Sequence, residues 1–237
     1  ATLTMVLVAN NAIFFNDTAT TEIYTNNNGS AMLTENNTNC NAVIGSANYD
    51  IGHVFSTGGG GVAYLNSPCT SIKAGGVTGS GAPVGDPFDI DYVAHEMGHQ
   101  YGGNHTQNNN CNRAANASVE VGSGITIMGY AGICAPDVAD NSIASFGGYS
   151  MQEMAANITT GASSGCPTTT AIANAQPTAN AGADYVIPRS TPFILTGSAT
   201  DANTSNVLTY SWEQMDNAVA TQPPAATNTG GPAWVPL

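Results

Sequence analysis

The chain has 237 residues, and its 16 carboxylates against three lysines and arginines give a formal net charge of -13. A surface this acidic repels phosphate backbones and anionic lipids, so we expect no nucleic-acid partner and no membrane-surface role. Hydrophobic residues make up 42% of the chain, which predicts a folded protein. No run of about 20 apolar residues, as a membrane span would need, is present.

Five cysteines, none in a Cys-x-x-Cys pair, argue against a thiolate zinc site or a redox motif. The simplest interpretation is two disulfides and one leftover thiol, which indicates an oxidising compartment. We therefore expect a secreted protein whose export signal is not part of this sequence. The cysteines are Cys40, Cys69, Cys111, Cys134 and Cys166.

The first part of the chain predicts two strands and a helix. Residues 3–8 form an apolar run typical of a buried strand, and a second apolar run follows at 13–15. Residues 16–25 coincide with the translation of a common sequencing-adapter oligonucleotide, and we assign them no function. Residues 30–44 predict a short helix, and the alternation over 49–55 predicts a strand.

Glycine dominates the next segment. Four glycines at 58–61 precede an apolar run at 62–65, for which we expect an edge strand with a flexible lead. A nucleotide-binding glycine loop would need a helix directly after it, and none is predicted here. Residues 74–87 are rich in glycine, serine and proline and predict a loop.

Two helices are predicted further along the chain. The first covers residues 88–100, with Asp86 or Asp89 as its candidate N-cap. The second covers residues 146–158, with Ser150 as its candidate N-cap.

The last part of the chain has a different composition. Residues 160–179 are low in complexity and predict a linker. Short alternating segments at 183–188, 193–197 and 207–212 predict strands separated by turns, which is the pattern of a β-sandwich. Because only a few strands are present, we expect this second module to be incomplete.

The chemistry is carried by the segment HEMGHQYGGNH at 95–105. At 3.6 residues per turn, His95 and His99 project from the same face of a helix. Gly102 can adopt a positive φ, end the helix and return His105 to the same ion as the third ligand. Three neutral histidines leave one coordination position open, as a catalytic zinc site requires.

Glu96 completes a hydrolytic site. Zinc lowers the pKa of its bound water to about 7 and polarises a substrate carbonyl. We expect Glu96 to take the water's proton and to deliver it to the leaving amine. HExxH alone occurs by chance in many helices, but the further glycine and histidine at fixed offsets are much harder to obtain by accident. The fourth histidine, His53, lies in a strand-like run and is expected to be a packed or surface histidine rather than a ligand.

This segment resembles the signature of the metzincin metallopeptidases, HExxHxxGxxH followed by a methionine-bearing turn. The chain has a matching turn, ITIMGY, at 125–130. The resemblance implies that Met128 lies beneath the zinc as a packing base. It also implies that Tyr130 approaches the zinc or the oxyanion, as in the astacin-like and serralysin-like members. The implied function is that of a zinc-dependent endopeptidase acting on proteins or peptides, and we expect a monomer.

Within this clan, the cysteine positions are similar to those of the reprolysin (adamalysin) branch. That branch implies the pairs Cys69–Cys166 and Cys111–Cys134, with one cysteine left over. Reprolysins usually place an aspartate after the third histidine, whereas this chain has Thr106. The difference favours a bacterial reprolysin-like family.

The resemblance implies an α/β fold of the metzincin type, with a twisted mixed sheet and the active-site helix beneath it. We expect a catalytic domain at 1–166 that lacks its N-terminal part, followed by a linker at 167–180. The segments AGADY at 181–185 and LTYSWE at 208–213 resemble the opening of a PKD-like immunoglobulin-type module, so we expect a partial β-sandwich at 181–237.

Two other functions remain open. A catalytically silent adhesion protein could keep zinc for stability, although the intact Glu96 argues against it. A zinc hydrolase of a non-peptide amide is the second, and the methionine turn argues against that. No loop matches the spacing of an EF-hand, so a calcium site is the weaker interpretation of the acidic residues. The candidate calcium ligands are Asp86, Asp89, Asp91, Asp137 and Asp140.

Overall fold

A computed structural model describes residues 23–188 and 191–217. Among these residues the chain divides into two compact units: a smaller unit at 168–211, and a larger unit that combines 23–167 with 212–217. The strand predicted at 3–8 and the apolar run at 13–15 lie outside the described residues. In the part of the chain that is described, no helix has the length and apolar character that crossing a bilayer requires.

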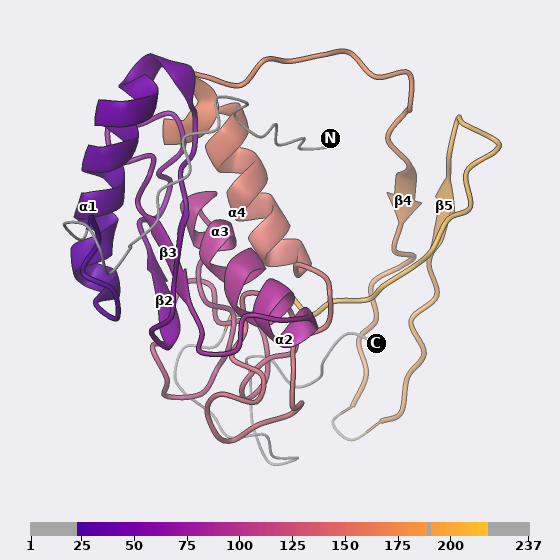
Figure 1. The fold of residues 1–237 in the computed structure, drawn as a ribbon. Coiled ribbons are helices and arrows are strands. Elements are labelled where there is room, and N and C mark those ends of the chain that lie inside the picture. The colour runs from indigo at the N-terminus through magenta and orange to yellow at the C-terminus, as the bar shows by residue number, and fades with distance from the viewer. Residues whose placement is uncertain (1–22, 189–190, 218–237) are drawn as a thin grey trace. The chain divides into compact units, whose positions relative to one another are not determined.

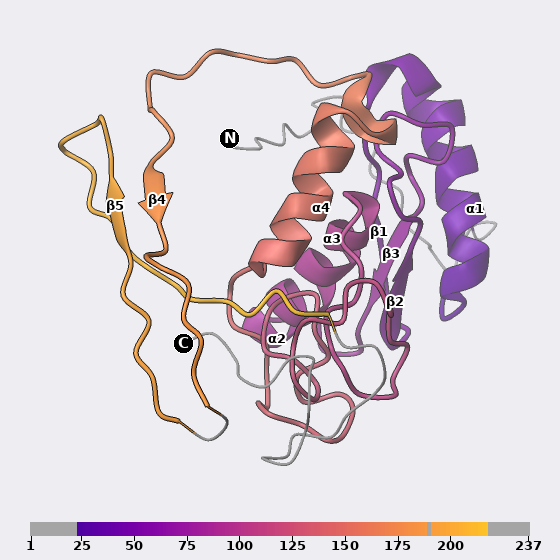
Figure 2. The ribbon, with the colours of Figure 1, turned by 180° about the vertical axis from the view of Figure 1, so that it is seen from behind.

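A three-stranded sheet forms the middle of the larger unit (Figure 1). Its strands are β1 (Val54–Ser56), β2 (Gly60–Ala63) and β3 (Gly76–Gly79), in the order β1-β3-β2. The central strand β3 is parallel to β1 and antiparallel to β2. Helix α1 (Gly29–Cys40) covers one face and helix α3 (His95–Gln100) the other (Figure 2). The mixed sheet between helices agrees with the predicted α/β class, and β2 pairs on one side only among the described strands, as an edge strand does.

Helix α1 begins at a side-chain cap. The Asn28 side chain accepts a hydrogen bond from the Ala31 N–H (3.1 Å), which satisfies one of the donors that a helix start leaves unpaired. The helix continues into a π-helical turn, η1 (Asn41–Gly45), so the prediction of a helix over 30–44 is confirmed. Met32 of α1 is buried against Val77 of β3 in the core cluster of this face.

The predicted loop over 74–87 is wrong at its start, because the central strand β3 lies there. A Cβ at Gly76 would meet the Gln100 amide and the His53 ring, and a Cβ at Gly79 would meet the Gly58 carbonyl. These glycines therefore allow neighbouring groups to pack closely against a fully buried strand, and they do not indicate a flexible loop. Composition alone could not distinguish the two.

The helix predicted over 88–100 is confirmed as three consecutive helical segments. They are α2 (Asp86–Phe88), the π-helical η3 (Asp89–Ala94) and α3. Neither Asp86 nor Asp89 is the N-cap, because Gly85 holds that position and makes no side-chain hydrogen bond. Its φ of 69° is a conformation that favours glycine.

Helix α4 (Gly148–Thr159) corresponds to the last predicted helix, but Ser150 is not its cap. Ser150 lies inside the helix and is buried, and Gly147 is the N-cap residue. The Gly148 N–H instead donates to the carboxylate of Glu213. A negative charge at this position also complements the dipole of the helix. The partner comes from 65 residues along the chain, which local spacing could not reveal.

The smaller unit contains one antiparallel ladder of two strands, β4 (Thr178–Asn180) and β5 (Ser198–Thr200). The tail strands predicted from alternation are not formed in the described residues; they were placed at 183–188, 193–197 and 207–212. Large apolar side chains in these segments are exposed, namely Val186, Ile194 and Val207. The described residues therefore supply no second layer of a β-sandwich.

Asn36 anchors α1 to the sheet and gives a test of this packing. Its side-chain N–H donates to the buried Ala74 carbonyl (2.7 Å), and its oxygen accepts from the Tyr24 hydroxyl (3.0 Å). Asn36→Ala removes both bonds, so the free energy of unfolding in urea should fall by about 1–3 kcal/mol. Thr34→Ala, exposed on the same helix, should change it by less than about 0.5 kcal/mol. Equal effects of the two substitutions would contradict the buried anchor.

Candidate metal centre

A helix and the turn after it bring three histidines together. His95 and His99 lie one turn apart on α3, with ring centroids 4.7 Å apart. Gly102 follows the helix with a φ of 106°, which favours glycine, and turns the chain back. The His105 ring then lies 4.5 Å from that of His99 and 5.2 Å from that of His95. In the described residues these three form the one group whose ligand atoms all lie within 4.8 Å of one another.

Backbone carbonyl oxygens hold all three imidazole rings. The Nδ1 atom of His95 bonds to Ile127 (2.6 Å), that of His99 to Gly103 (2.7 Å) and that of His105 to Asn112 (2.8 Å). Because a carbonyl oxygen can only accept, each Nδ1 must carry the ring proton. Each Nε2 therefore keeps a lone pair for a metal ion, and each ring has a fixed orientation.

The spacing of the Nε2 atoms fits a cation. Those of His99 and His105 are 2.9 Å apart, a distance at which two facing lone pairs repel each other. A cation between the rings would remove this repulsion. Three neutral imidazoles with a fourth position open match the donor set of a catalytic zinc ion. The residues present thus fit zinc.

Burial keeps these imidazoles in the neutral form that binds metal. Desolvation, joined by the neighbouring histidines, lowers the pKa of His95 well below its usual range. Desolvation and the nearby His105 lower the pKa of His99 to about 4. Burial also lowers the pKa of His105.

Glu96 is a buried carboxyl group, with only 7% of its surface exposed. Its Oε2 has no hydrogen-bond partner among the described residues, and burial raises its pKa to about 8. The carboxyl group lies against Gly61 of β2, where any Cβ would collide with it. The edge strand therefore leaves room for Glu96 because residue 61 is glycine.

Met128 is fully buried beneath α3. A Cβ on Gly98, between His95 and His99, would meet the methionine sulfur, so this close packing depends on glycine. The turn that carries Met128 is closed by a hydrogen bond from the Gly129 N–H to the Thr126 carbonyl (2.8 Å). A role for Met128 as a packing base beneath the metal stays a prediction. Gly98 was not among the predicted site residues, although an isolated glycine inside a helix is a signal of close packing.

Tyr130 lies at the edge of the histidine cluster. Its ring centroid is 4.7 Å from that of His105 and 5.6 Å from that of His95. Its hydroxyl oxygen accepts a hydrogen bond from the Asn112 side chain (3.3 Å), and burial raises its pKa. Asn112, with a φ of 50°, thus holds both the Tyr130 hydroxyl and the His105 ring.

The two disulfides are the pairs that the resemblance implied. Cys69 is joined to Cys166 and Cys111 to Cys134, and Cys40 is free and buried. Cys111 directly precedes Asn112 in the chain. The second bridge therefore ties the carbonyl that receives His105 to the segment after the methionine turn.

His53 is hydrogen-bonded through both ring nitrogens and lies outside the group of three histidines in the described residues. Its Nδ1 donates to the Gln100 side-chain oxygen and its Nε2 accepts from the Thr78 hydroxyl, both at 2.8 Å. Gln100 in turn donates to the Gly52 carbonyl (2.9 Å). Burial lowers the pKa of His53, so this network stays neutral while it fixes the residue after His99.

Glu153 of α4 fixes the residue that precedes the third histidine. Its carboxylate accepts from the Asn104 backbone N–H (2.9 Å) and from the Asn104 side chain (2.7 Å). Both oxygens are used on one residue, so Asn104 has one orientation next to His105. Glu153 was not predicted from the sequence, because it is 49 residues from Asn104 and belongs to no motif.

The aspartates considered for calcium do not join the metal-ligand group of the described residues. They are Asp86, Asp89, Asp91, Asp137 and Asp140. Asp91 accepts a hydrogen bond from the Ser142 backbone N–H (2.9 Å). A calcium site stays a prediction.

Comparison with known families agrees with this geometry. The family model described as metallo-peptidase family M12B, reprolysin-like, matches residues 1–157. The matched span contains the three-stranded sheet, the three histidines and most of α4. No curated protein matches the chain.

The site predicts binding of one zinc ion per chain, measured by metal analysis and by competition with a fluorescent chelator. His105→Ala removes a ligand, so its zinc affinity should fall by more than the roughly 100-fold that loss of an outer-shell partner can cost. His53→Ala removes a buried histidine outside the cluster and should keep the wild-type zinc affinity. Unchanged zinc binding in His105→Ala would contradict the site.

Proposed function

Because the chain belongs to the reprolysin-like M12B metallopeptidase family, we propose that it is a secreted zinc-dependent endopeptidase in which Glu96 is the general base. The observation that carries the proposal is the convergence of three Nε2 lone pairs, together with the adjacent residue Glu96, whose buried Oε2 has no hydrogen-bond partner in the part of the chain that the structure describes. The metal ligands and the base thus come from one short helix and its turn. The two disulfides support an extracellular protein.

His95, His99 and His105 would hold the zinc, which when bound lowers the pKa of a water molecule and polarises a substrate carbonyl. Glu96 accepts the proton of the attacking water at its unpartnered oxygen and then donates it to the leaving amine. Burial supports this role, because it raises the pKa of the carboxyl group and so its affinity for the proton that it takes from the water. The narrow space against Gly61 restricts the carboxyl group to one side of α3.

Tyr130 is the proposed partner of the carbonyl oxygen on which negative charge develops. A hydroxyl donor aimed at that oxygen stabilises the transition state. Asn112 orients the Tyr130 hydroxyl from its other side, and the Tyr130 ring packs on His105.

The substrate is proposed to be an extended peptide that adds to the free edge of β2. Strand addition uses backbone hydrogen bonds and leaves specificity to side-chain pockets. β2 pairs with β3 alone among the described strands, and the Glu96 carboxyl group lies against its residue 61. A peptide bound at this edge would therefore lie next to the base.

Two finer assignments rest on the sequence alone. The presence of Thr106 in place of the reprolysin aspartate supports a bacterial reprolysin-like protein. The assignment of residues 181–237 to a partial PKD-like module rests on the similarity of the segments AGADY at 181–185 and LTYSWE at 208–213 to the opening of such modules.

Glu96→Gln tests the proposed base. The amide cannot accept the proton, so kcat/KM for a casein-derived peptide should fall by about 100-fold or more, while the zinc content stays at the wild-type value. A chelator should abolish wild-type cleavage. If zinc-loaded wild type and Glu96→Gln are equally inert on peptides, the silent adhesion protein becomes the better interpretation. Hydrolysis of small amides but not of peptides would favour the other alternative.

Gly61→Ala tests the position of the base without changing it chemically. The new Cβ would push the Glu96 carboxyl group aside, so kcat should fall by about 10- to 100-fold, the scale expected for a misplacement near 1 Å. Gly59→Ala is the matched control, because a Cβ there meets nothing within 4 Å. Both variants should retain zinc. Equal kcat values for the two would show that Gly61 does not position Glu96.

A further inference from the structure

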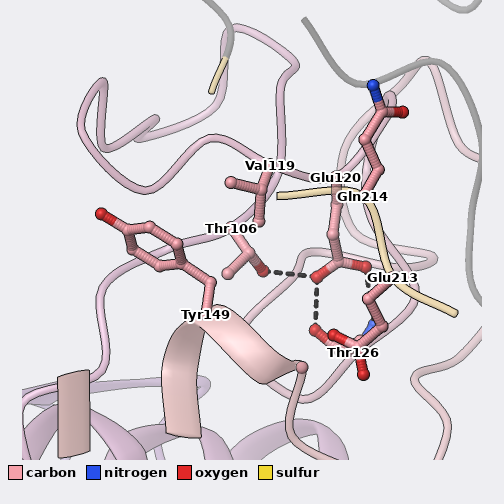
Figure 3. Close-up of a pocket in the computed structure, with 8 residues that line it drawn as sticks. Thr106, Val119, Glu120, Thr126, Tyr149, Glu213 and Gln214 are labelled. Carbon is pink, nitrogen blue, oxygen red and sulfur yellow. Dashed lines mark hydrogen bonds between the residues drawn. The ribbon is translucent and has the colours of Figure 1, made fainter. Parts of the chain in front are cut away.

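Glu120 is a buried carboxylate between two loops of the larger unit (Figure 3). Only 5% of its surface is exposed. One carboxylate oxygen accepts from the hydroxyls of Thr106 (2.5 Å) and Thr126. The other accepts from the backbone N–H groups of Ile125 (2.7 Å) and Thr126 (3.0 Å). Four donors from two separate segments thus converge on one side chain.

The two segments are those that carry the metal site. Thr106 directly follows His105, the third histidine. Thr126 directly precedes Ile127, whose carbonyl receives the Nδ1 proton of His95. In one segment, the residue that donates to the Glu120 carboxylate is therefore the sequence neighbour of a metal-site histidine. In the other segment, it is the sequence neighbour of the residue whose carbonyl accepts from a metal-site histidine.

Backbone hydrogen bonds place Glu120 in register with both loops. Its N–H donates to the Thr106 carbonyl (2.9 Å), and the Thr106 N–H donates to the Met128 carbonyl (3.1 Å). The main chain thus aligns the segments, and the carboxylate connects their side chains. Charge-assisted hydrogen bonds of this kind are stronger than neutral ones.

We propose that Glu120 is a positioning residue for the metal site: it fixes the loop of His105 against the turn of Met128 and so sets the zinc affinity. The inference rests on the proposed zinc-dependent function and deepens it. Where reprolysins usually carry an aspartate directly after the third histidine, this chain has a threonine whose hydroxyl reaches a carboxylate supplied by residue 120.

The surroundings of Glu120 do not suit a ligand-binding role. Both of its oxygens are already engaged by two donors each. A narrow pocket beside it is lined by Tyr149 of α4 and by Glu213. The Glu213 carboxylate is itself engaged by the Gly148 N–H at the start of α4. Glu120 therefore acts within the fold rather than on a bound molecule.

The bonding pattern predicts different effects for two substitutions. In Glu120→Gln, the amide oxygen can accept the two backbone N–H groups while the amide nitrogen donates to the two hydroxyls, because hydroxyl oxygens also accept. The connection survives without the charge. In Glu120→Ala all four donors lose their partner, and the two loops are joined by backbone bonds alone.

The experiment compares the zinc dissociation constants of folded wild type, Glu120→Gln and Glu120→Ala by competition with a fluorescent chelator. We expect Glu120→Ala to weaken zinc binding by about 10- to 100-fold, the range for outer-shell partners of a metal site. Glu120→Gln should recover most of the wild-type affinity. In steady-state cleavage, Glu120→Ala should lower kcat at saturating zinc while KM stays unchanged, because Glu120 touches no substrate.

Asn36→Ala is the matched control, because it removes a similarly buried polar side chain from α1, which packs on the other face of the sheet from α3. It should lower stability and leave zinc affinity unchanged. If Glu120→Ala behaves in the same way, the role of Glu120 is only structural and the proposal is overturned.

If Glu120→Ala does not fold, Thr106→Val removes one hydroxyl at constant shape. It should weaken zinc binding less than Glu120→Ala but in the same direction, and wild-type affinity would overturn the proposal.

The result also separates this inference from the proposed function. Wild type that binds zinc and cleaves peptides, with Glu120→Ala unchanged in zinc affinity, removes the positioning role alone. Wild type that binds no zinc removes the proposed function, and the role of Glu120 falls with it.

Discussion

The three hydrogen bonds from imidazole Nδ1 atoms to backbone carbonyls are the constraint on which the larger unit depends. They decide the tautomer of each ring and direct each Nε2 toward a common point. Their acceptors, Gly103, Ile127 and Asn112, belong to three different segments of irregular chain. A carbonyl can orient a ring only if its own peptide is held, so each segment needs support from outside.

That support comes mainly from polar groups. No helix or strand is assigned between the end of α3 and the start of α4 in the described chain, yet many residues there are fully buried. Examples are Asn109, which donates to the Cys134 carbonyl (2.6 Å) and accepts from the Cys111 N–H (3.1 Å), and Ser118, whose hydroxyl donates to the Gln107 carbonyl (3.0 Å). Buried polar networks fix one conformation when their members are paired. Only 8% of the residues are charged. Neutral amide and hydroxyl side chains therefore form hydrogen bonds in the interior of this chain as well as polar groups on its surface.

The part of the site that follows from the sequence is the part built by local geometry. The i, i+4 spacing places His95 and His99 on one face, and a glycine that allows a turn returns His105, so no distant contact is needed to predict them. Glu120 and Glu153 could not be predicted in this way, because each is defined by a partner 14 or 49 residues away. The same limit explains the N-cap of α4, where Glu213 takes the place that spacing assigned to Ser150.

The strand β3 shows a second limit, which concerns glycine. From the sequence, Gly76 falls in a predicted loop, Gly61 in a predicted flexible lead and Gly98 inside a predicted helix. Composition shows only that a Cβ is missing at these positions. In the structure the missing Cβ makes room for a neighbour: Gly76 for Gln100, Gly61 for Glu96, and Gly98 for Met128. Every one of these contacts involves α3. Helix α3 is therefore packed against its neighbours more closely than a Cβ at these three positions would allow. The glycines of α3 and of the adjacent strands thus determine where the metal ligands and the Glu96 carboxyl group can lie.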